Sequence, residues 1–559
     1  MLHLISLNCR YTHSCLAQFC LRAELERRLP ELPTHLSQFT LNDPYYPTLL
    51  RISSQPAHAL LFSVYVWNHA YIRRLTADLA RLQPNLPLIF GGPQAEMLTG
   101  LPPNCTVFLG EIEGAEDEFF HDLRQGALKP RYQAAPGRSF PSPYKTEDFS
   151  SHLKNRQVYY ESSRGCPFSC SYCLSSLSKG VRHKPLDLVQ EELRRLIAAK
   201  PLIIKFVDRT FNDKPERALA IWEFLLAEAD GVRFHFEIAP DRFTEELFAL
   251  LEQAPCDLFQ FEIGLQSCNE QTLTAVKRRM DVAKAEANIR RLVALNSIHI
   301  HADLILGLPE ETAASFRESF NRVFRCCPHY IQLGLLKVLP DTEMQARAAE
   351  FGLLHCAEPP YEVLSTRWLP HEELRDMHAF CECAEAFCNN RFFPSLWRYL
   401  RQKNEDAAAF FQALLQICKE EDFFRLAHTQ ILLNQMLVKL IRQRSDGPLL
   451  LELLRYDWLR CGHRFLPEEL TAAPPAALRD RLRQTLPQAV AGLFSSRTRT
   501  EFLKQTSLLE LSTAAMSVLA LGKEAGLVAL LPEQSGGALK HCRAVVLPDM
   551  EKGDDEKTA

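Results

Sequence analysis

The sequence predicts an α/β protein in three parts: a doubly wound parallel sheet, then a partial (β/α)6 barrel, then a mostly α-helical C-terminal part. Three observations predict this order. Short apolar runs alternate with amphipathic helical patterns up to about residue 348. In the central stretch, each apolar run ends in glycine or polar residues. From about residue 353 onward, apolar residues recur mainly at helical spacing.

Length and composition indicate a large soluble protein. A chain of 559 residues predicts roughly three to four domains. Its 64 basic and 68 acidic residues nearly cancel, which gives no charge signature for a nucleic-acid partner. No apolar run approaches the ~18 residues of a membrane span. We also expect no signal peptide, so the 18 cysteines indicate reduced thiols and a cytoplasmic location.

The first part, residues 1–130, has the alternation of a flavodoxin-like fold. Its expected strands and helices are Leu2–Leu7, Leu16–Leu29, His35–Thr40, Ala59–Val66, Ala70–Leu82, Pro87–Phe90 and Cys105–Leu109. In such sheets, ligands bind beyond the carboxyl ends of the strands. The loops expected there are Asn8–Ser14, Ser63–Asn68 and Gly91–Gln94. They offer hydrogen-bonding side chains and glycines that allow close approach of the backbone.

The remaining boundaries follow from the positions of prolines and from the periodicity of apolar residues. Prolines at Pro130, Pro136, Pro141 and Pro143 indicate an ordered linker over residues 131–156. The barrel is expected over 157–350 and a helical accessory domain over 351–547, and a charged tail, 548–559, is expected to be disordered.

Six apolar runs in the central part predict the barrel strands. Each is followed by polar or glycine residues, as at the active face of complete barrels. The runs are Gln157–Tyr160, Ile203–Val207, Phe234–Ala239, Phe259–Ile263, Ile298–Ile305 and Ile331–Val338.

A cysteine motif follows the first of these strands. Cys166, Cys170 and Cys173 have the spacing C-x3-C-x2-C. Soft thiolates in a tight set select zinc or iron–sulfur clusters over hard cations. Structural zinc normally takes four ligands, and no fourth Cys or His lies close by in the sequence. The motif therefore predicts a cluster with one iron left open to a small molecule.

This motif, with Tyr172 directly before its third cysteine, resembles that of the radical S-adenosylmethionine (SAM) superfamily. The resemblance implies a 4Fe–4S cluster whose open iron chelates SAM and whose electron cleaves it to a 5′-deoxyadenosyl radical. It also implies SAM contacts at strand ends: Asp208 near the amine, Glu262 and Gln266 near the ribose. The adenine would meet the backbone of the three residues Tyr172, Gly307 and Val338.

The first part resembles the cobalamin-binding domain that precedes this barrel in one subgroup. The resemblance is carried by the loops named above and implies cobalamin contacts at Asn8, Tyr11, Ser14, Ser63, Trp67, Gly91 and Gly92. No D-x-H-x-x-G motif occurs, so the cobalt is expected to have no protein nitrogen ligand, with His13 as a bystander. The other interpretation is a flavodoxin-like domain that has lost its ligand or binds another nucleotide. The stretch Gly110–Glu116 departs from a compact Gly-Glu-Gly-Glu and is interpreted as loop variation.

Together the resemblances imply a cobalamin-dependent radical SAM enzyme that methylates an unactivated carbon of a small molecule. An external electron donor of the flavodoxin or ferredoxin type would supply the enzyme with electrons. Three alternatives stay open: a cobalamin-dependent cyclase or rearrangement enzyme, a transfer-RNA methylthiotransferase, and a non-enzymatic cobalamin or redox sensor. The methylthiotransferase class needs three cysteines at strand ends of the first domain. Cys9 and Cys105 are expected near such ends, but Cys15 and Cys20 are expected on the following helix. The sequence names neither a substrate nor a catalytic residue.

Overall fold

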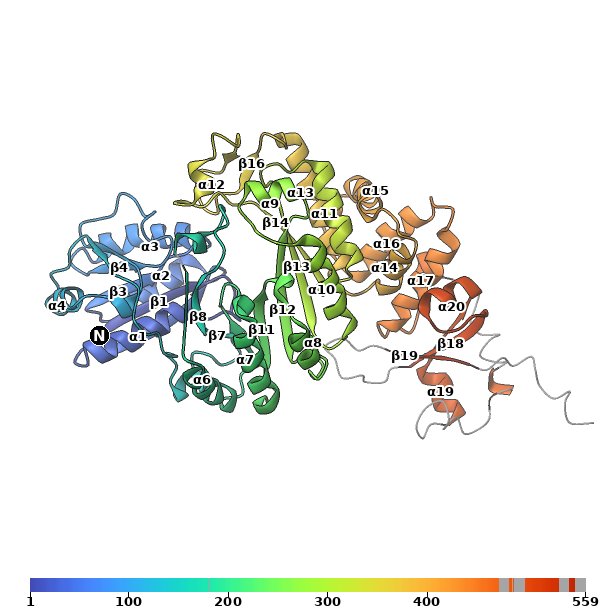
Figure 1. Cartoon of the computed structure of the whole chain (residues 1–559), viewed down its shortest axis with the longest axis horizontal. Helices are drawn as coiled ribbons and strands as arrows, with labels where there is room; N and C mark the ends of the chain where they lie inside the picture. The colour runs from blue at the N-terminus through green and yellow to red at the C-terminus, as the bar shows by residue number, and fades with distance from the viewer. Residues whose placement is uncertain (179, 472–481, 485, 487–497, 532–541, 548–559) are drawn as a thin grey trace, which may run out of the picture. The chain divides into compact units, whose positions relative to one another are not determined.

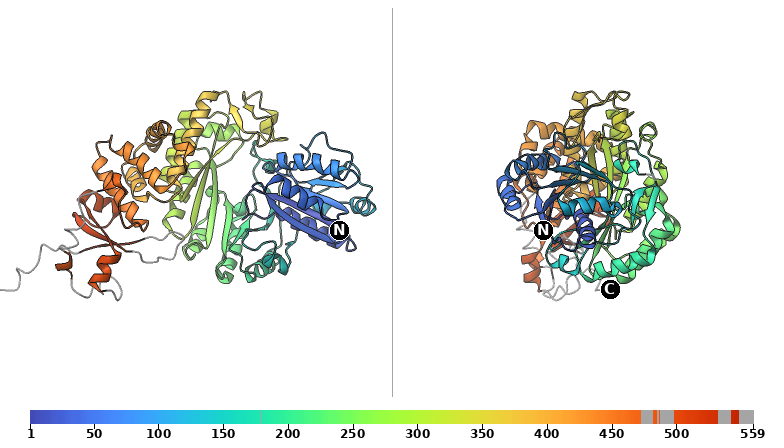
Figure 2. Two further views of the ribbon diagram at one scale, coloured as in Figure 1. Left: turned by 180° about the vertical axis from the view of Figure 1, so that it is seen from behind. Right: turned by 90° about the vertical axis from the view of Figure 1, so that its left-hand side faces the viewer.

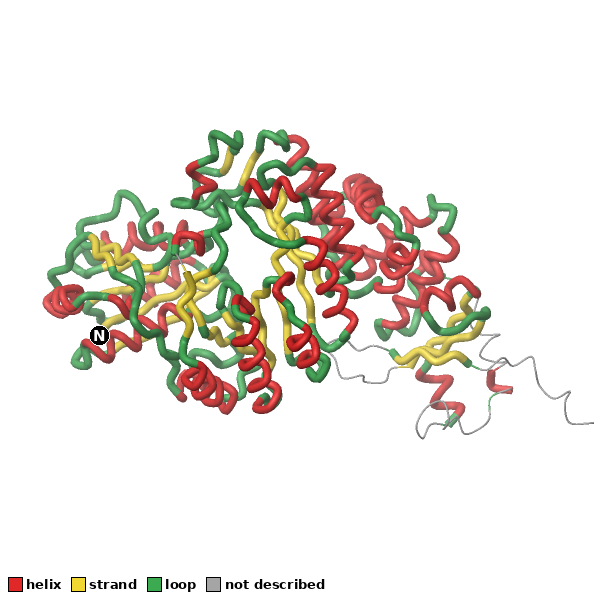
Figure 3. Tube along the Cα trace, viewed as in Figure 1, coloured by secondary structure: helices red, strands yellow, loops and turns green. Residues whose placement is uncertain are grey.

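The structure is a computed structural model that describes residues 1–178, 180–471, 482–484, 486, 498–531 and 542–547 (Figure 1). The chain divides into two compact units, each described by itself. The first comprises Met1–Phe316, Cys326–His329 and Gly334–Leu374; the second comprises Arg317–Arg325, Tyr330–Leu333 and the chain from Arg375. Figure 2 gives two further views, and Figure 3 colours helices, strands and loops. The tail predicted to be disordered, 548–559, lies outside the described residues.

The N-terminal sheet has six parallel strands in the order β2-β1-β3-β4-β5-β6. This is the flavodoxin-like order with one strand added, so the predicted doubly wound fold is confirmed. The elements are β1 (Leu2–Asn8), α1 (Leu16–Arg28), β2 (Thr34–Thr40), α2 (Tyr45–Ser53), β3 (Ala59–Ser63), α3 (His69–Leu82), β4 (Leu88–Gly91), β5 (Cys105–Leu109), η1 (Ile112–Gly114), α4 (Asp117–Gln125) and β6 (Arg131–Gln133).

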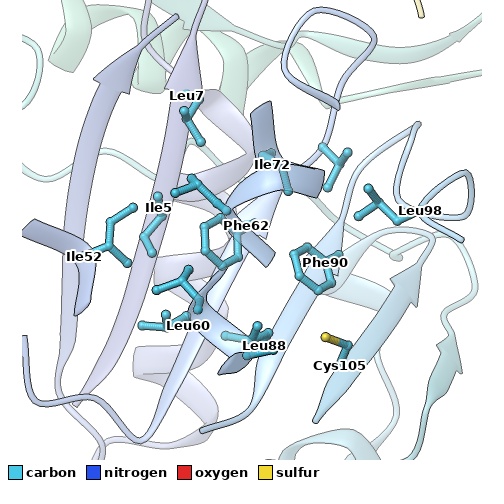
Figure 4. Packing of buried hydrophobic residues seen from close by; sticks show 14 of the residues in the cluster. Ile5, Leu7, Ile52, Leu60, Phe62, Ile72, Leu88, Phe90, Leu98 and Cys105 are labelled. Carbon is cyan, nitrogen blue, oxygen red and sulfur yellow. The ribbon is translucent and has the colours of Figure 1, made fainter. Parts of the chain in front are cut away.

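Alternation along the strands divides the core of this sheet between its two faces. On one face, Ile5, Leu60, Phe62 and Phe90 pack with residues of α2 and α3 such as Ile72 (Figure 4). A continuous buried layer of this size fixes the register of the strands, because a slip by one residue would turn the apolar set to the other face.

The segment predicted as a linker contributes to the first fold. It supplies β6, the edge strand of the sheet, and the short helix α5 (Thr146–Ser150). Asp148 of α5 forms a two-pronged ion pair with Arg22 of α1, at 2.6 and 2.5 Å. Their side chains are only 1% and 7% exposed, so this segment is packed against the first domain and not merely draped over it.

The central sheet has the strand order β14-β13-β12-β11-β10-β7, so all six predicted strands are adjacent in chain order as a partial barrel requires. The elements from the cysteine motif onward are β7 (Val158–Tyr160), β8 (Ser163–Cys166), η2 (Leu174–Leu177), β9 (Gly180–His183), α6 (Leu186–Ala198), β10 (Ile203–Phe206), η3 (Phe211–Asp213), α7 (Pro215–Glu228), β11 (Arg233–Ile238), η4 (Pro240–Arg242), α8 (Glu245–Leu251), β12 (Phe259–Gln266), α9 (Glu270–Ala275), α10 (Val282–Ala294), β13 (His299–Leu306), α11 (Ala313–Arg325), β14 (Tyr330–Leu335), α12 (Glu343–Ala346), β15 (Leu354–His355) and β16 (Val363–Ser365).

The C-terminal part is mostly helical, as predicted, but it also contains a three-stranded antiparallel sheet that the sequence did not reveal. The described elements are α13 (His371–Cys388), α14 (Pro394–Gln402), α15 (Ala407–Glu420), η5 (Phe423–Arg425), α16 (Gln430–Ile441), α17 (Gly447–Arg460), η6 (Glu468–Leu470), α19 (Arg499–Gln505), β17 (Ser507–Leu511), α20 (Thr513–Leu519), β18 (Gly526–Leu531) and β19 (Arg543–Val546). Across the described part of the chain, no helix combines the length and apolarity of a membrane span.

Candidate functional site

The three cysteines of the motif lie on one hairpin of the first unit. Cys166 ends β8, which pairs antiparallel with β9, and Cys170 and Cys173 follow in the connecting loop. None of the three is in a disulfide. Gly165 has φ +100°, and a Cβ at this position would collide with the carbonyl oxygen of Gly180. The motif therefore starts on a strand whose close pairing only glycine permits.

The surroundings of Cys170 suit a thiolate ligand. Cys170 is buried, Nη1 of Arg278 lies 3.8 Å from its Sγ, and the Tyr172 hydroxyl is hydrogen-bonded to the same sulfur. Burial raises the pKa of this thiol, and the Arg278 cation opposes that rise. A cation beside the sulfur would offset the charge of a metal-bound thiolate. Arg278 was not singled out in the sequence, because it lies 108 residues from Cys170.

Within the described residues, no group of three or more His, Cys, Asp or Glu side chains is gathered tightly enough to hold a single metal ion. A four-iron cluster does not need such convergence, since each thiolate binds a different iron. Three free, soft donors on one short loop next to a guanidinium therefore fit a cluster better than a zinc ion.

Asp208 holds the start of the cysteine hairpin. Its carboxylate is buried and accepts hydrogen bonds from the Ser162 backbone N–H at 2.9 Å and from the Ser162 and Ser163 hydroxyls, both at 2.6 Å. Burial raises the pKa of Asp208, and these hydrogen bonds oppose that rise. The two serines come directly before Arg164, Gly165 and Cys166, so Asp208 fixes the strand that carries the first cysteine.

The other residues predicted to contact SAM lie at or near strand ends, and their contacts with SAM stay predictions. Glu262 on β12 lies 3.1 Å from Nε2 of His235. Gln266 is the last residue of β12 and has φ +71°. Gly307 follows β13 with φ +91°, and the buried Val338 donates its N–H to a neighbouring carbonyl. Tyr172 lies beside Cys170 as described above.

A cavity of about 640 Å³ opens at the carboxyl ends of the first sheet. Six of the seven residues predicted to contact cobalamin line it: Asn8, Ser14, Ser63, Trp67, Gly91 and Gly92. The seventh, Tyr11, is not among its lining residues; this residue is 58% exposed, and its ring lies beneath the guanidinium of Arg156. The cavity continues between α1 and the sheet, where Ala17, Leu61 and Ile89 give it an apolar wall. Its volume lies within the range of small-molecule and cofactor sites.

Tyr65 and Asn68, which were not among the predicted cobalamin contacts, also line this cavity. The rings of Tyr65 and Trp67 stack with centroids 4.4 Å apart. The Asn68 amide donates to the carbonyls of Leu7 and Ser63, at 3.1 and 3.0 Å, which ties the ends of β1 and β3 together. An Asn before a helix usually indicates a cap, and here its side chain instead bridges two strands.

His13, expected to be a bystander, also lines the cavity. Its Nδ1 is 2.7 Å from the Tyr159 hydroxyl, and burial lowers its pKa, which keeps the ring neutral at physiological pH. Tyr159 belongs to the first barrel strand, so the barrel contributes to the wall of the same cavity, together with Glu161, Arg164 and Arg209.

The loop that follows β5 was interpreted from the sequence as a loop variation. In the structure, Glu111 and Glu113 of this loop line the cavity and form ion pairs with Arg164 of the cysteine hairpin. No sequence motif signals this pairing, because the partners lie 53 and 51 residues apart.

Comparison with known proteins gives two family matches. Residues 160–323 match the radical SAM superfamily, and residues 349–497 match a family described as a protein of unknown function, DUF4080.

Curated relatives match over a large part of the chain. The chain is 24% identical over 416 residues to a 2-(S-pantetheinyl)-carbapenam-3-carboxylate methyltransferase of Streptantibioticus cattleyicolor, covering 64% of this chain and 61% of the relative. It is 23% identical over 403 residues to the cobalamin-dependent radical SAM methyltransferase TokK of Streptomyces tokunonensis, covering 62% and 59%. The chain thus spans about 60% of the length of these relatives.

Among solved structures, the apo form of the cobalamin-dependent S-adenosylmethionine radical enzyme OxsB aligns with a TM-score of 0.57 at 13% identity, over 82% of each chain. This likeness concerns the fold.

Proposed function

Residues 160–323 form a radical SAM domain, and from this premise we propose that the chain is a cobalamin-dependent radical SAM enzyme that methylates an unactivated carbon of a small molecule. One observation carries the proposal. The cavity of the first domain is walled in part by residues of the barrel and of the cysteine hairpin, Tyr159, Glu161, Arg164 and Arg209. A cofactor held in that cavity would thus face the barrel, which a transfer between two cofactor sites requires.

Each proposed cofactor has its own residues in the first unit. Cys166, Cys170 and Cys173 would hold the 4Fe–4S cluster, with Arg278 beside the second thiolate. When bound, the cluster supplies the electron that cleaves SAM, and cobalamin carries the methyl group. The protein holds and orients these groups and keeps water away. The six predicted residues of the cavity wall would hold cobalamin. Glu262, Gln266, Gly307 and Val338, with Tyr172, would hold SAM, whereas the Asp208 carboxylate is used to anchor Ser162 and Ser163.

The two similar methyltransferases support the reaction class. A cyclase or rearrangement enzyme would share all of these residues, and only the products would separate the two. We place the enzyme in the cytoplasm with an external flavodoxin- or ferredoxin-type electron donor. None of the 18 cysteines is in a disulfide, which fits a reducing compartment.

One observation favours a second candidate, the methylthiotransferase class with an additional cluster. Cys9, Cys15 and Cys20 all line the first-domain cavity. Cys105, expected near the same strand ends, is instead the first residue of β5. It therefore lies at the amino ends of the parallel strands, whereas Cys9 follows the carboxyl end of β1. The Cys15 thiol is hydrogen-bonded to the side chains of Ser63 and Tyr65, so it has partners without a metal.

Metal analysis after anaerobic reconstitution distinguishes these functions. A single cluster gives about four irons and four sulfides per chain, and a second cluster about eight irons. Cys170→Ala should abolish the cluster and SAM cleavage, whereas Cys256→Ala, at an exposed thiol, should keep both. Wild-type protein that binds only zinc would refute the radical mechanism.

Cobalamin binding tests the methylation proposal separately. The reconstituted protein should take up cobalamin, and the electron paramagnetic resonance spectrum of the Co(II) form should lack nitrogen superhyperfine splitting. Splitting that disappears in His13→Ala would identify His13 as an axial ligand, since it is a cavity-lining imidazole whose Nδ1 is held by Tyr159. No uptake under any redox condition would refute methylation through cobalamin.

A further inference from the structure

Two arginines of the cysteine hairpin bind the acidic loop of the first domain. Arg164 and Arg182 are paired across β8 and β9. Arg164 donates from Nε to Glu161 at 2.9 Å, from Nη1 to Glu111 at 2.9 Å and from Nη2 to Glu113 at 2.8 Å. Arg182 forms a second ion pair with Glu111. One guanidinium is therefore shared by three carboxylates from two parts of the chain.

Burial makes this network more than a surface ion pair. The Arg164 side chain is 15% exposed and that of Glu113 is 9% exposed, so water screens their interaction little. The Phe140 ring lies under the Arg164 guanidinium at 4.5 Å. Removal of one charge would leave its partners charged and poorly solvated, which is far more costly than loss of an exposed pair.

The backbone conformation of the acidic loop, Gly110–Gly114, is itself restricted. Glu111 accepts a hydrogen bond from the Gly137 backbone N–H at 3.0 Å. Gly110 has φ +93°, and a Cβ on Gly114 would collide with the carbonyl oxygen of Ala135. The Glu111 and Glu113 carboxylates therefore cannot follow a displaced Arg164 without a change in the loop backbone.

The network lies between the two proposed cofactor sites. Arg164 is two residues from Cys166, and the intervening Gly165 tolerates no Cβ. Glu111, Glu113, Glu161 and Arg164 all line the first-domain cavity. A ligand that fills the cavity would contact these carboxylates and limit their movement, and the same carboxylates position the strand that carries the first cysteine.

We propose that Arg164 is a positioning residue that couples occupancy of the first-domain cavity to the position of the cysteine hairpin, through its contacts with Glu111, Glu113 and Glu161. This inference rests on the proposed function, because it requires a cobalamin in the cavity. A ligand shifts a conformational equilibrium only through groups that it contacts differently in the two states, and this network supplies them.

Hydrogen–deuterium exchange of the full-length, reconstituted protein tests the coupling. The probe is aquocobalamin, and its uptake is followed separately by its visible absorbance. In the wild type, cobalamin should slow exchange at the amides of β8 and β9 by about tenfold or more. In Glu113→Gln and Arg164→Lys, each measured at a cobalamin concentration that saturates that variant, this protection should be lost, since neither variant can make the full set of forked, charge-assisted contacts. Glu245→Gln, which breaks the exposed pair with Arg291, is the matched control and should keep the wild-type protection.

A second readout separates coupling from simple loss of structure. The cluster spectrum of the wild type should change when cobalamin is added, and that change should be absent in Glu113→Gln at unchanged iron content. Wild-type protein that binds cobalamin without protection of the hairpin, or variants that keep the protection, would overturn the coupling and leave the proposed function intact. Absence of cobalamin binding by the wild type would overturn both.

Discussion

Replacement of Asp208 by alanine should damage the cysteine hairpin before it affects any ligand. The carboxylate accepts three hydrogen bonds from Ser162 and Ser163 in a buried setting. The two hydroxyls can turn to other acceptors, but the Ser162 N–H cannot, and a buried donor left without a partner costs about 1–3 kcal/mol. Part of this loss is offset, because the buried carboxylate is itself poorly solvated, as the raised pKa of Asp208 indicates. We expect a net loss of about 2 kcal/mol in stability.

The assay compares iron content, denaturation and SAM affinity in matched variants. Asp208→Ala should lower the denaturation midpoint of the apoprotein and the iron bound per chain, whereas Asp230→Ala, in an exposed pair with Lys200, should change neither. Asp208→Asn keeps one acceptor oxygen for the Ser162 N–H, so it should recover most of the iron. If Asp208 instead binds the SAM amine directly, Asp208→Asn would lose SAM affinity at full iron content. A fully loaded, normally stable Asp208→Ala protein would refute the anchoring role.

Three further predictions concern other parts of the first unit. Burial raises the pKa of Glu237 from 4.5 to about 7. Because the unfolded chain releases this proton at lower pH than the folded protein, the free energy of unfolding should fall by up to about 3 kcal/mol as pH rises from 4.5 through 7. In denaturant unfolding, Glu237→Gln should therefore be more stable than the wild type at pH 8 but not at pH 4.5. Gly92→Val should reduce cobalamin uptake measured by absorbance, because φ is +101° and a Cβ would lie 2.7 Å from the Val64 carbonyl oxygen, so this cavity-lining loop would have to move; normal uptake would show that cobalamin does not depend on this loop. Asp148→Ala leaves the buried Arg22 without its partner and should cost roughly 3–5 kcal/mol in denaturant unfolding; a loss below 1 kcal/mol would show that water reaches this pair.

The parts of the fold that sequence predicted are those with a repeated local signal. Strands such as Cys105–Leu109 and helices such as α15 stand out because their apolar residues repeat at a fixed period over several turns or residues. β6 is only three residues long, too short for a period to be visible. The strands β17 to β19 form a sheet whose middle strand, Gly526–Leu531, is a short continuous apolar run. Periodicity alone cannot assign such a run to a helix or to a strand.

The candidate site divides in the same way. The cysteine motif and the strand-end loops are contiguous in sequence, so their residue types could be interpreted directly. The contacts that hold them are not contiguous: Tyr159 meets His13 across 146 residues, and Asp208 meets Ser162 across 46. Such pairs depend on the placement of whole strands, and a single sequence contains no local pattern for them. The acidic loop was therefore interpreted as a variation although it binds the cysteine hairpin.

The interior of the barrel gives the last argument about its use. Glu237 and Glu262 are paired in register on β11 and β12, and Glu262 is paired with His301 on β13. Their neighbours along the strands, such as Phe236 and Phe261, are fully buried on the other face of the sheet. A barrel packed as a core fills its interior with branched apolar side chains, but here that face carries two carboxylates and the His301 imidazole at one level. Polar groups at this level need a paired side chain, as Glu262 has in His235, or water or a polar ligand. We therefore expect the concave face of the barrel to bind a polar ligand, with the apolar core outside its strands.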